Sequence, residues 1–424
     1  MKELNIPIID VNGVYSEGVY NCGTNFLNSS RGTLADAVMK CISQADETDF
    51  VNYCNGVKKL GFEQASISRI DDNVFTVFEN GQKQLFVSYE PKRERVTVIL
   101  DSSSCKERDF SYRLTRNDTK SAEFYMYGLN LDHQGYDTYN KLNTSGYTNC
   151  GMLFVIKCID NSLIIVDGGE ESSFSEQDID KLNDFLHRVA EKNTDEKIRI
   201  CCWYLTHAHS DHLRGFFKLM YKYGEQYELE RIISNLPDFE KYGGQPVEEM
   251  QSFSQFVRTK YPNCRDMKAH AGQRLQLADV VIEVLCTHEC IVDAQTLDTK
   301  KNDLNDRSLV LKFSSGGISF LMLGDICFLP EDYMTTVFSD NTLKCDVVQM
   351  AHHCINPLEK IYAATNSQIT FIPQHENAVK THPVINRAFR AAEPFIVDAF
   401  YSGCANLTTG VYLDGEEIRI IRHA

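Results

Sequence analysis

The sequence predicts an α/β fold that is preceded by an N-terminal α+β module. The chain has 424 residues, which exceeds the length at which a single hydrophobic core keeps growing, so two domains are expected. Before residue 148 the apolar residues alternate as in antiparallel strands, whereas after it short apolar runs are interleaved with helical segments. We therefore expect one domain at residues 1–147 and a second at residues 148–424.

The N-terminal module shows two helix-like segments followed by a series of strands. The helix-like segments span residues 33–45 (TLADAVMKCISQA) and 49–60 (DFVNYCNGVKKL), and the strands span residues 62–70, 73–78, 83–90 and 95–101. Asn80-Gly81 separates two of these strands and readily takes the positive φ angles of a tight hairpin turn. Residues 102–147 are polar and poorly periodic, which indicates a long connection with some short strands. The role of the module stays open between covering the active site, binding a substrate and forming a dimer.

The second domain alternates strands with helices. Asp160-Asn161 predicts a hairpin between residues 151–159 and 162–169, and residues 176–192 have the apolar spacing of a helix. A strand at 198–206 and a helix at 211–220 follow. Further apolar runs predict strands at residues 231–236, 278–285, 308–313, 318–325, 346–353 and 368–373, and a final hairpin at 410–421. Buried strands between helices are typical of α/β layers.

Composition narrows the functional classes. With 43% hydrophobic and 24% charged residues, the chain resembles an ordinary globular protein. Its longest apolar stretches are too short to span a bilayer and its N-terminus lacks a signal-like pattern, so we expect no membrane partner. Fifteen scattered cysteines, an odd number, favour the reducing cytoplasm over a disulfide framework. The net charge of -16 argues against a protein that coats duplex nucleic acid, and the oligomeric state stays open.

The stretch THAHSDH, residues 206–212, predicts a metal site. His207 and His209 lie one residue apart at the end of a strand, where both imidazoles point to one side, and Asp211 and His212 begin the next helix. Neutral imidazole and carboxylate are the ligands that zinc and similar divalent ions prefer. The alternative is an exposed polar loop that caps a helix at Ser210. Because so few histidines occur in the chain, their grouping favours the metal site.

This HxHxDH pattern, preceded by an apolar strand that ends in Asp-Gly-Gly, resembles the metallo-β-lactamase-fold hydrolases over roughly residues 148–424. The resemblance implies a four-layer αββα sandwich that carries one or two metal ions. It implies His207 and His209 for the first ion, Asp211 and His212 for the second, and Asp325 as the bridge between them. Asp167 supports the histidine loop, and the last ligand is His352 or His353, of which we favour His352.

The motif order is similar to one branch of that superfamily, the hydrolase domain of competence DNA-uptake channels (ComEC-like) and its free-standing relatives. Asn305, Ser308 and His382 with Pro383 stand at positions typical of this branch, where Asn305 and Ser308 support the site. The branch usually carries HHGS where this chain has HHCI. Because the membrane channel is absent here, the resemblance does not imply a role in DNA transport.

One position departs from the wider superfamily, which supplies a third histidine to the first ion from a strand end. Asn235 occupies that place in this sequence. His270 and His288 are the other histidines in the interval, and each is an alternative ligand. ComEC-like relatives also tend to lack this histidine, so water or Asn235 is expected to fill the position.

The resemblance and the ligand types together predict a metal-dependent hydrolase. We expect zinc as the cofactor, and manganese or iron are the alternatives. Two divalent ions are expected to bind, and ions of this kind activate a water molecule. Asp211 is expected to orient this water, and His382 to contact the substrate or protonate the leaving group, unless Pro383 merely holds it in a turn. The favoured substrate is a phosphodiester in a nucleotide, a nucleic acid or a related small molecule. Lactone, thioester or β-lactam hydrolysis, and a non-catalytic binding protein, are the alternatives.

Overall fold

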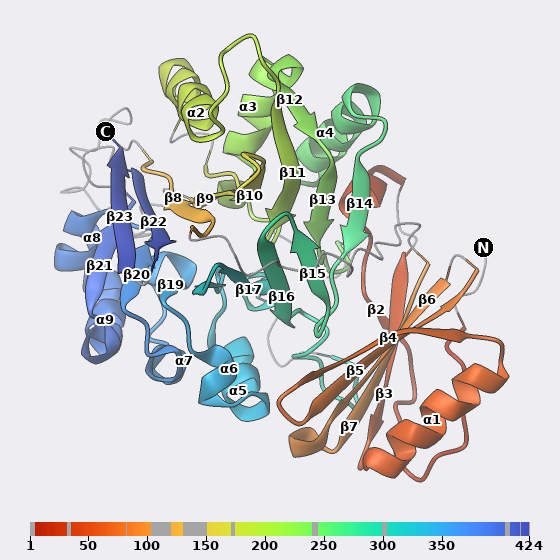
Figure 1. Cartoon of the computed structure of the whole chain (residues 1–424). Coiled ribbons are helices and arrows are strands. Elements are labelled where there is room, and N and C mark those ends of the chain that lie inside the picture. Colours follow the sequence, from red (N-terminus) through yellow and green to blue (C-terminus); the bar gives the residue numbers. More distant parts are fainter. Residues whose placement is uncertain are drawn as a thin grey trace.

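In the computed structural model the described residues form three β-sheets, and helices cover them (Figure 1). It describes residues 5–31, 35–81, 83–102, 120–129, 151–170, 174–239, 245–298, 303–402, 408–415 and 417–423. Most of the connection predicted at residues 102–147 lies outside these ranges. Among the described helices, none is both long enough and apolar enough to cross a membrane.

The first sheet belongs to the N-terminal part of the chain, in the order β1-β3-β7-β6-β5-β4 with β2 paired to β3. A helix, α1 (Glu47–Lys59), packs on one face of this sheet through a core that includes Tyr53, Val57 and Phe78. The reciprocal capping bonds between Asp46 and Asp49 begin the helix. The strands are β1 (Val14–Tyr15), β2 (Tyr20–Asn21), β3 (Ala37–Ser43), β4 (Glu63–Ile70), β5 (Asn73–Asn80), β6 (Lys83–Glu90) and β7 (Arg95–Asp101).

The helix predicted at residues 33–45 is wrong, because this segment forms strand β3. Ala37, Met39 and Cys41 are fully buried on one side, and β3 pairs antiparallel with β7 along its whole length. Alanine and methionine favour helices in isolation, but pairing and burial in the sheet override such local preferences. The other predicted elements of the module, α1 and strands β4 to β7, are confirmed.

Two larger sheets form the second part of the molecule. One has the order β14-β13-β11-β10-β9-β8-β22-β23, with β12 paired to β11, and the other has the order β15 to β21. The first contains β8 (Glu123–Met126), β9 (Leu153–Lys157), β10 (Leu163–Asp167), β11 (Ile198–Leu205), β12 (Tyr227–Leu229), β13 (Arg231–Ser234), β14 (Arg265–Lys268), β22 (Thr408–Asp414) and β23 (Glu417–His423). The second contains β15 (Arg274–Leu277), β16 (Val280–Cys286), β17 (Val310–Ser315), β18 (Ile318–Met322), β19 (Val347–Gln349), β20 (Ile369–Ile372) and β21 (Asp398–Tyr401).

These sheets pack face to face, and helices cover their outer faces. Phe154 from one sheet and Phe320 and Phe371 from the other meet in the core between them. Helices α2 (Glu176–Val189), α3 (Arg214–Tyr223) and α4 (Val247–Lys260) lie beside β11 and β13, and helices α5 (Phe328–Val337), α6 (Asp340–Leu343), α7 (Glu359–Thr365), α8 (Glu376–Thr381) and α9 (Pro383–Ala392) lie beside the other sheet (Figure 1). The layers confirm the predicted αββα sandwich.

Candidate metal centre

The predicted ligands meet where strands of both central sheets end. His207 and His209 follow β11, and Asp211 and His212 lie in the single turn of 3-10 helix that comes next, Ser210–His212. Asp325 follows β18 after Gly324, which takes φ 60° to turn the chain, and His353 follows β19. All of these side chains except that of His209 are buried. The two sheets therefore position one cluster from distant parts of the sequence.

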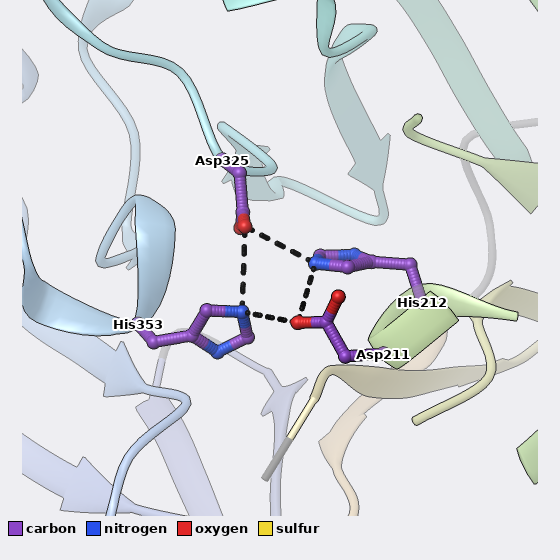
Figure 2. Close-up of side chains that lie close together, drawn as sticks. All are labelled: Asp211, His212, Asp325 and His353. Carbon is purple, nitrogen blue, oxygen red and sulfur yellow. Dashed lines mark hydrogen bonds and ion pairs between the residues drawn. The ribbon is translucent and has the colours of Figure 1, made fainter. Parts of the chain in front are cut away.

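One group of possible ligands contains Asp211, His212, Asp325 and His353 (Figure 2). The Nε2 atom of His353 lies 3.1 Å from Asp211 Oδ2 and 3.3 Å from Asp325 Oδ2. The Nε2 atom of His212 lies 3.2 Å from Asp325 Oδ2 and 3.5 Å from Asp211 Oδ2. Two ligand atoms on a tetrahedral zinc ion lie roughly 3.4 Å apart, given metal–ligand distances of about 2.0–2.1 Å. The spacing of this group therefore fits a divalent ion.

A second group contains His207, His209 and again Asp325. His207 Nε2 lies 3.0 Å from His209 Nδ1 and 3.8 Å from Asp325 Oδ2. Because Asp325 belongs to both groups, its carboxylate would be shared by two ions if both groups held one. The structure thus brings His207, His209, Asp211, His212, Asp325 and His353 together as the sequence predicts.

His212 and His207 are each held through the ring nitrogen that points away from the cluster. His212 Nδ1 lies 2.7 Å from Asp167 Oδ2, and His207 Nδ1 lies 3.3 Å from Ser308 Oγ. Ser308 Oγ also accepts a hydrogen bond from the backbone N–H of Asp325. Partners of this kind orient metal-binding imidazoles. Asp167 and Ser308 therefore lie in contact with the rings of His212 and His207.

Two supporting groups were missed by sequence reasoning. Thr206 donates from its backbone N–H and its hydroxyl to Asp167, at 2.8 and 3.0 Å to Oδ1. The carbonyl oxygen of Pro373 accepts a hydrogen bond from His353 Nδ1 at 3.2 Å. Thr206 directly precedes the histidine motif, which is a usable signal, whereas Pro373 comes from a different strand end and offers none.

The Pro373 contact tests whether the site suits a cation. A carbonyl oxygen only accepts, so Nδ1 of His353 carries the hydrogen, and in the neutral ring Nε2 then presents a lone pair. That lone pair points at the carboxylates of Asp211 and Asp325, which are also electron-rich. The lone pair and the carboxylate oxygens repel one another when no cation lies between them. A divalent ion at this place would be coordinated by all of these atoms. The donor set therefore fits a metal ion.

Burial and charge set the protonation states that a metal site requires. Burial lowers the pKa of His207 and of His209, which keeps both imidazoles neutral. Burial opposes charge on His212, but Asp325, Asp211 and Asp167 raise its pKa well above the ordinary value. Burial alone would raise the pKa of Asp325, but positive charge on His353 and His212 holds it well below its ordinary value. A bound divalent ion would take the place of these protons. Neutral imidazole and ionised carboxylate are the forms that bind metal.

The preference for His352 over His353 is corrected by the structure. His352 Nε2 lies 4.0 Å from Asp325 Oδ2 and 3.3 Å from Asn305 Nδ2, and its Nδ1 lies 3.0 Å from Asn356 Nδ2. His352 therefore lies beside the cluster in contact with amide groups, and His353 points into it. The chain takes left-handed backbone angles at both histidines, with φ 48° at each, and such a turn cannot be read from two adjacent letters. Asn305 supports His352 rather than a ligand.

The candidates for the missing third histidine lie outside both groups. Asn235 donates from Nδ2 to Ala269 O at 2.6 Å and to Glu289 Oε2 at 2.9 Å. His270 lies between Glu289 and Asp101, and His288 Nδ1 contacts the Tyr20 hydroxyl at 3.2 Å. None of these residues belongs to the two ligand groups found in the described part of the chain.

His382 begins helix α9, where its Nδ1 accepts a hydrogen bond from the backbone N–H of Ile385 at 3.4 Å, and Pro383 occupies the first turn. The side chain is buried, at 5% exposure. These contacts agree with a histidine held in a turn, and His382 does not belong to either ligand group of the described residues.

The ion triad at His270 predicts a pH-dependent stability. Burial opposes charge on His270, but Glu289 and Asp101 raise its pKa to about 9 from an ordinary 6.5. Stability from this shift is fully present below pH 6.5 and is lost as the pH rises through about 9. At about 1.36 kcal/mol per pKa unit, we expect the unfolding free energy of the wild type, relative to His270→Gln, to fall by roughly 3 kcal/mol across this range.

Urea unfolding of both proteins between pH 6 and 9.5 measures this difference. If the difference in unfolding free energy between the two proteins stayed constant over this pH range, the ion triad would be contradicted. His187→Gln provides the matched control, because His187 is also buried but its Nε2 contacts the amide of Gln226 rather than a carboxylate.

Solved structures with a similar fold cover about two thirds of this chain. They include the metallo-β-lactamase fold protein YhfI from Bacillus subtilis (11% identity, 66% of this chain, 96% of that chain, TM-score 0.38) and Zn²⁺-bound PqqB from Methylobacterium extorquens (10% identity, 68% and 99%, TM-score 0.41). A diphosphatase from the PhnP family is also similar (9% identity, 69% and 98%, TM-score 0.38). No family model and no curated protein sequence matches the chain. The described residues of this chain form two central sheets between layers of helices, with a cluster of residues that could hold metal ions.

Proposed function

We propose that this protein is a metal-dependent hydrolase. The substrate we favour is a phosphodiester in a nucleotide, a nucleic acid or a related small molecule. The observation that carries the proposal is the position of Asp325, whose Oδ2 faces His207 from one ligand group and His212 and His353 from the other. Two ions that share a carboxylate suit an in-line displacement at phosphorus, because they contact the attacking and the leaving oxygen. We propose zinc as the metal, with manganese and iron as alternatives.

The residues around such ions have different roles. Divalent ions bound by these residues would lower the pKa of a water molecule and so make it a better nucleophile near neutral pH. Asp211, which lies beside His353 and His212, orients that water. Asp167 and Ser308 hold the histidines that position the ions. We assign to His382 the substrate contact or the proton for the leaving group, as the sequence predicts.

The proposal extends to the branch, the domains and the setting of the protein. Asn305, Ser308 and His382 with Pro383 support the ComEC-like branch of the superfamily. We propose residues 148–424 as the hydrolase domain and residues 1–147 as an accessory module that contributes β8 to the hydrolase sheet. A small-molecule or nucleic-acid-derived substrate and a cytoplasmic location complete the proposal. The fifteen scattered cysteines, an odd number, support a reducing compartment.

The test is hydrolysis of bis(p-nitrophenyl) phosphate by the full chain after loading with zinc, manganese or iron. We expect turnover that His353→Gln abolishes and that the adjacent variant His352→Gln largely keeps, because only His353 points at the two carboxylates. A homoserine lactone and a thioester, assayed in parallel, separate the other hydrolase classes. Metal binding without turnover of any of these substrates would favour a non-catalytic binding protein and contradict the proposal.

A further inference from the structure

Two cysteines lie side by side at the end of β16 and in the turn that follows it. Cys286 is the last residue of the strand, and the backbone N–H of Cys290 donates to the carbonyl oxygen of Thr287 at 3.0 Å, which closes the turn. This turn brings the two thiols into hydrogen-bond contact. Both side chains are thiols in the structure, so the contact joins two reduced sulfur atoms.

The loop that carries these cysteines lies where the N-terminal sheet meets the hydrolase part of the chain. Arg93, between β6 and β7, donates from Nη1 to the carbonyl oxygen of Cys290 at 2.9 Å. Arg95, on β7, donates from Nη2 to the carbonyl oxygen of Glu289 at 3.4 Å. The Glu289 carboxylate also contacts His270 Nδ1 at 3.1 Å. A covalent bond across this loop would therefore act on contacts with both parts of the chain.

The two cysteines differ in their access to small solutes. Cys290 lines a cavity of about 700 Å³, together with residues from strands β4 to β7 and from the segments 267–275 and 287–290. The cavity reaches the surface at Glu63 and Gln64, which are both exposed. Cys286 is not among the described residues that line it and is fully buried. A small solute in the cavity therefore meets Cys290 rather than Cys286.

The surroundings of the two thiols divide their chemistry in the same way. Burial raises the pKa of Cys286 well above its ordinary value. Burial and the charge of Glu90 oppose ionisation of Cys290, but contacts with the Cys286 thiol, the backbone of Thr287 and the Tyr333 hydroxyl lower its pKa. Because the thiolate is the form that attacks an oxidant, Cys290 is the better nucleophile and Cys286 is placed to react with it afterwards.

We propose that Cys286 and Cys290 form a reversible oxidation site, in which a peroxide converts the two thiols into a disulfide. Cys290 attacks one oxygen of hydrogen peroxide, the O–O bond breaks, and a sulfenic acid and one water molecule form. The Cys286 sulfur then attacks the sulfenic sulfur, so that the S–S bond forms and a second water molecule leaves. The two thiols lose two electrons and two protons, and a dithiol reductant restores them.

This site is separate from the candidate metal centre. Neither cysteine belongs to the two ligand groups found in the described part of the chain. The proposal therefore goes beyond the proposed hydrolase function, and it holds or fails whatever substrate the metal centre has. A reversible disulfide of this kind is compatible with a reducing compartment, where disulfides are transient and report an oxidant.

The experiment treats the full, zinc-loaded chain with hydrogen peroxide under native conditions, blocks the remaining thiols with iodoacetamide in urea, and maps the peptides by mass spectrometry. We expect the peptide with Cys286 and Cys290 to lose two hydrogen atoms and to carry no alkyl group, and we expect dithiothreitol to restore both alkylation sites. Cys286→Ser is expected to leave Cys290 as a sulfenic acid that dimedone labels, whereas Cys290→Ser is expected to leave Cys286 reduced. The mapping of the wild type does not depend on the folding of either variant.

Cys158 and Cys201 provide the matched control pair within the same chain. Their thiols also contact each other and both are buried, but neither is among the described residues that line the cavity. We expect the pair Cys286 and Cys290 to oxidise roughly tenfold faster or more, since thiolate character and access set the rate. The proposal would be overturned if Cys286 and Cys290 stayed reduced, oxidised only in urea, paired with other cysteines, or oxidised no faster than the control pair.

Discussion

Replacement of Asp325 by asparagine is expected to remove the metal ions and to lower kcat/KM for a phosphodiester by about a thousand-fold or more, which corresponds to about 4 kcal/mol of transition-state stabilisation. The physical reason is that one carboxylate serves both ligand groups, so its loss weakens two ion sites at once. Asparagine keeps the size of the side chain but not its charge, and it leaves the buried imidazoles of His207, His212 and His353 without the carboxylate that faces them. Steady-state kinetics on metal-loaded protein measure the effect.

Asp346→Asn is the control for Asp325→Asn. Asp346 is also next to a strand of the second central sheet, but its carboxylate accepts hydrogen bonds from the backbone N–H and hydroxyl of Ser319 and belongs to neither ligand group. We expect this variant to retain its metal and its kcat/KM. An Asp325→Asn protein that keeps full activity would show that the two groups do not form one centre.

Replacement of Trp203 by alanine is expected to lower the free energy of unfolding by about 3–5 kcal/mol, the usual cost of removing a large aromatic side chain from a core. Trp203 is fully buried on β11, stacks on Phe216 with ring centroids 4.5 Å apart, and meets Phe26 and Phe253 edge to face. Phe26 comes from the N-terminal part of the chain, so this contact also joins the two parts. Urea unfolding followed by circular dichroism measures the change.

Trp203→Phe separates packing from hydrogen bonding. The indole Nε1 donates to the carbonyl oxygen of Asp167 at 3.0 Å, and phenylalanine keeps most of the ring contact but not this bond. We expect the lost hydrogen bond to lower the free energy of unfolding by about 1 kcal/mol, in addition to the effect of the smaller ring. Because Trp203 is the only tryptophan of the chain, its fluorescence reports on this core in the wild type alone. A Trp203→Ala protein as stable as the wild type would contradict the packing described here.

Much of the fold was predictable because hydrophobic periodicity matched the pairing that the chain adopts. Helix α2 has the spaced apolar residues from which a helix was predicted, and the strands around the metal loop are nearly continuous apolar runs. Strand β3 was not predictable in this way, because its alanine and methionine residues favour a helix and only long-range pairing with β7 decides the outcome.

The grouping of these histidine and aspartate side chains was predictable as a set but not in its details. The HxHxDH motif and the aspartates at strand ends fix residue types and their order along the chain. The choice of His353 over His352 depends on left-handed backbone angles at both residues, which the two letters do not encode. The triad of Asp101, His270 and Glu289 joins residues 169 and 19 positions apart, so no local pattern reveals it.

The measurement that tests the central claim most directly is metal content per chain, by elemental mass spectrometry, on protein purified without chelators or nickel affinity. We predict nearly two equivalents of zinc, manganese or iron in the wild type and almost complete loss in Asp325→Asn, because that residue belongs to both ligand groups. A wild-type chain that carries no metal and takes up none on titration with these ions would contradict the account.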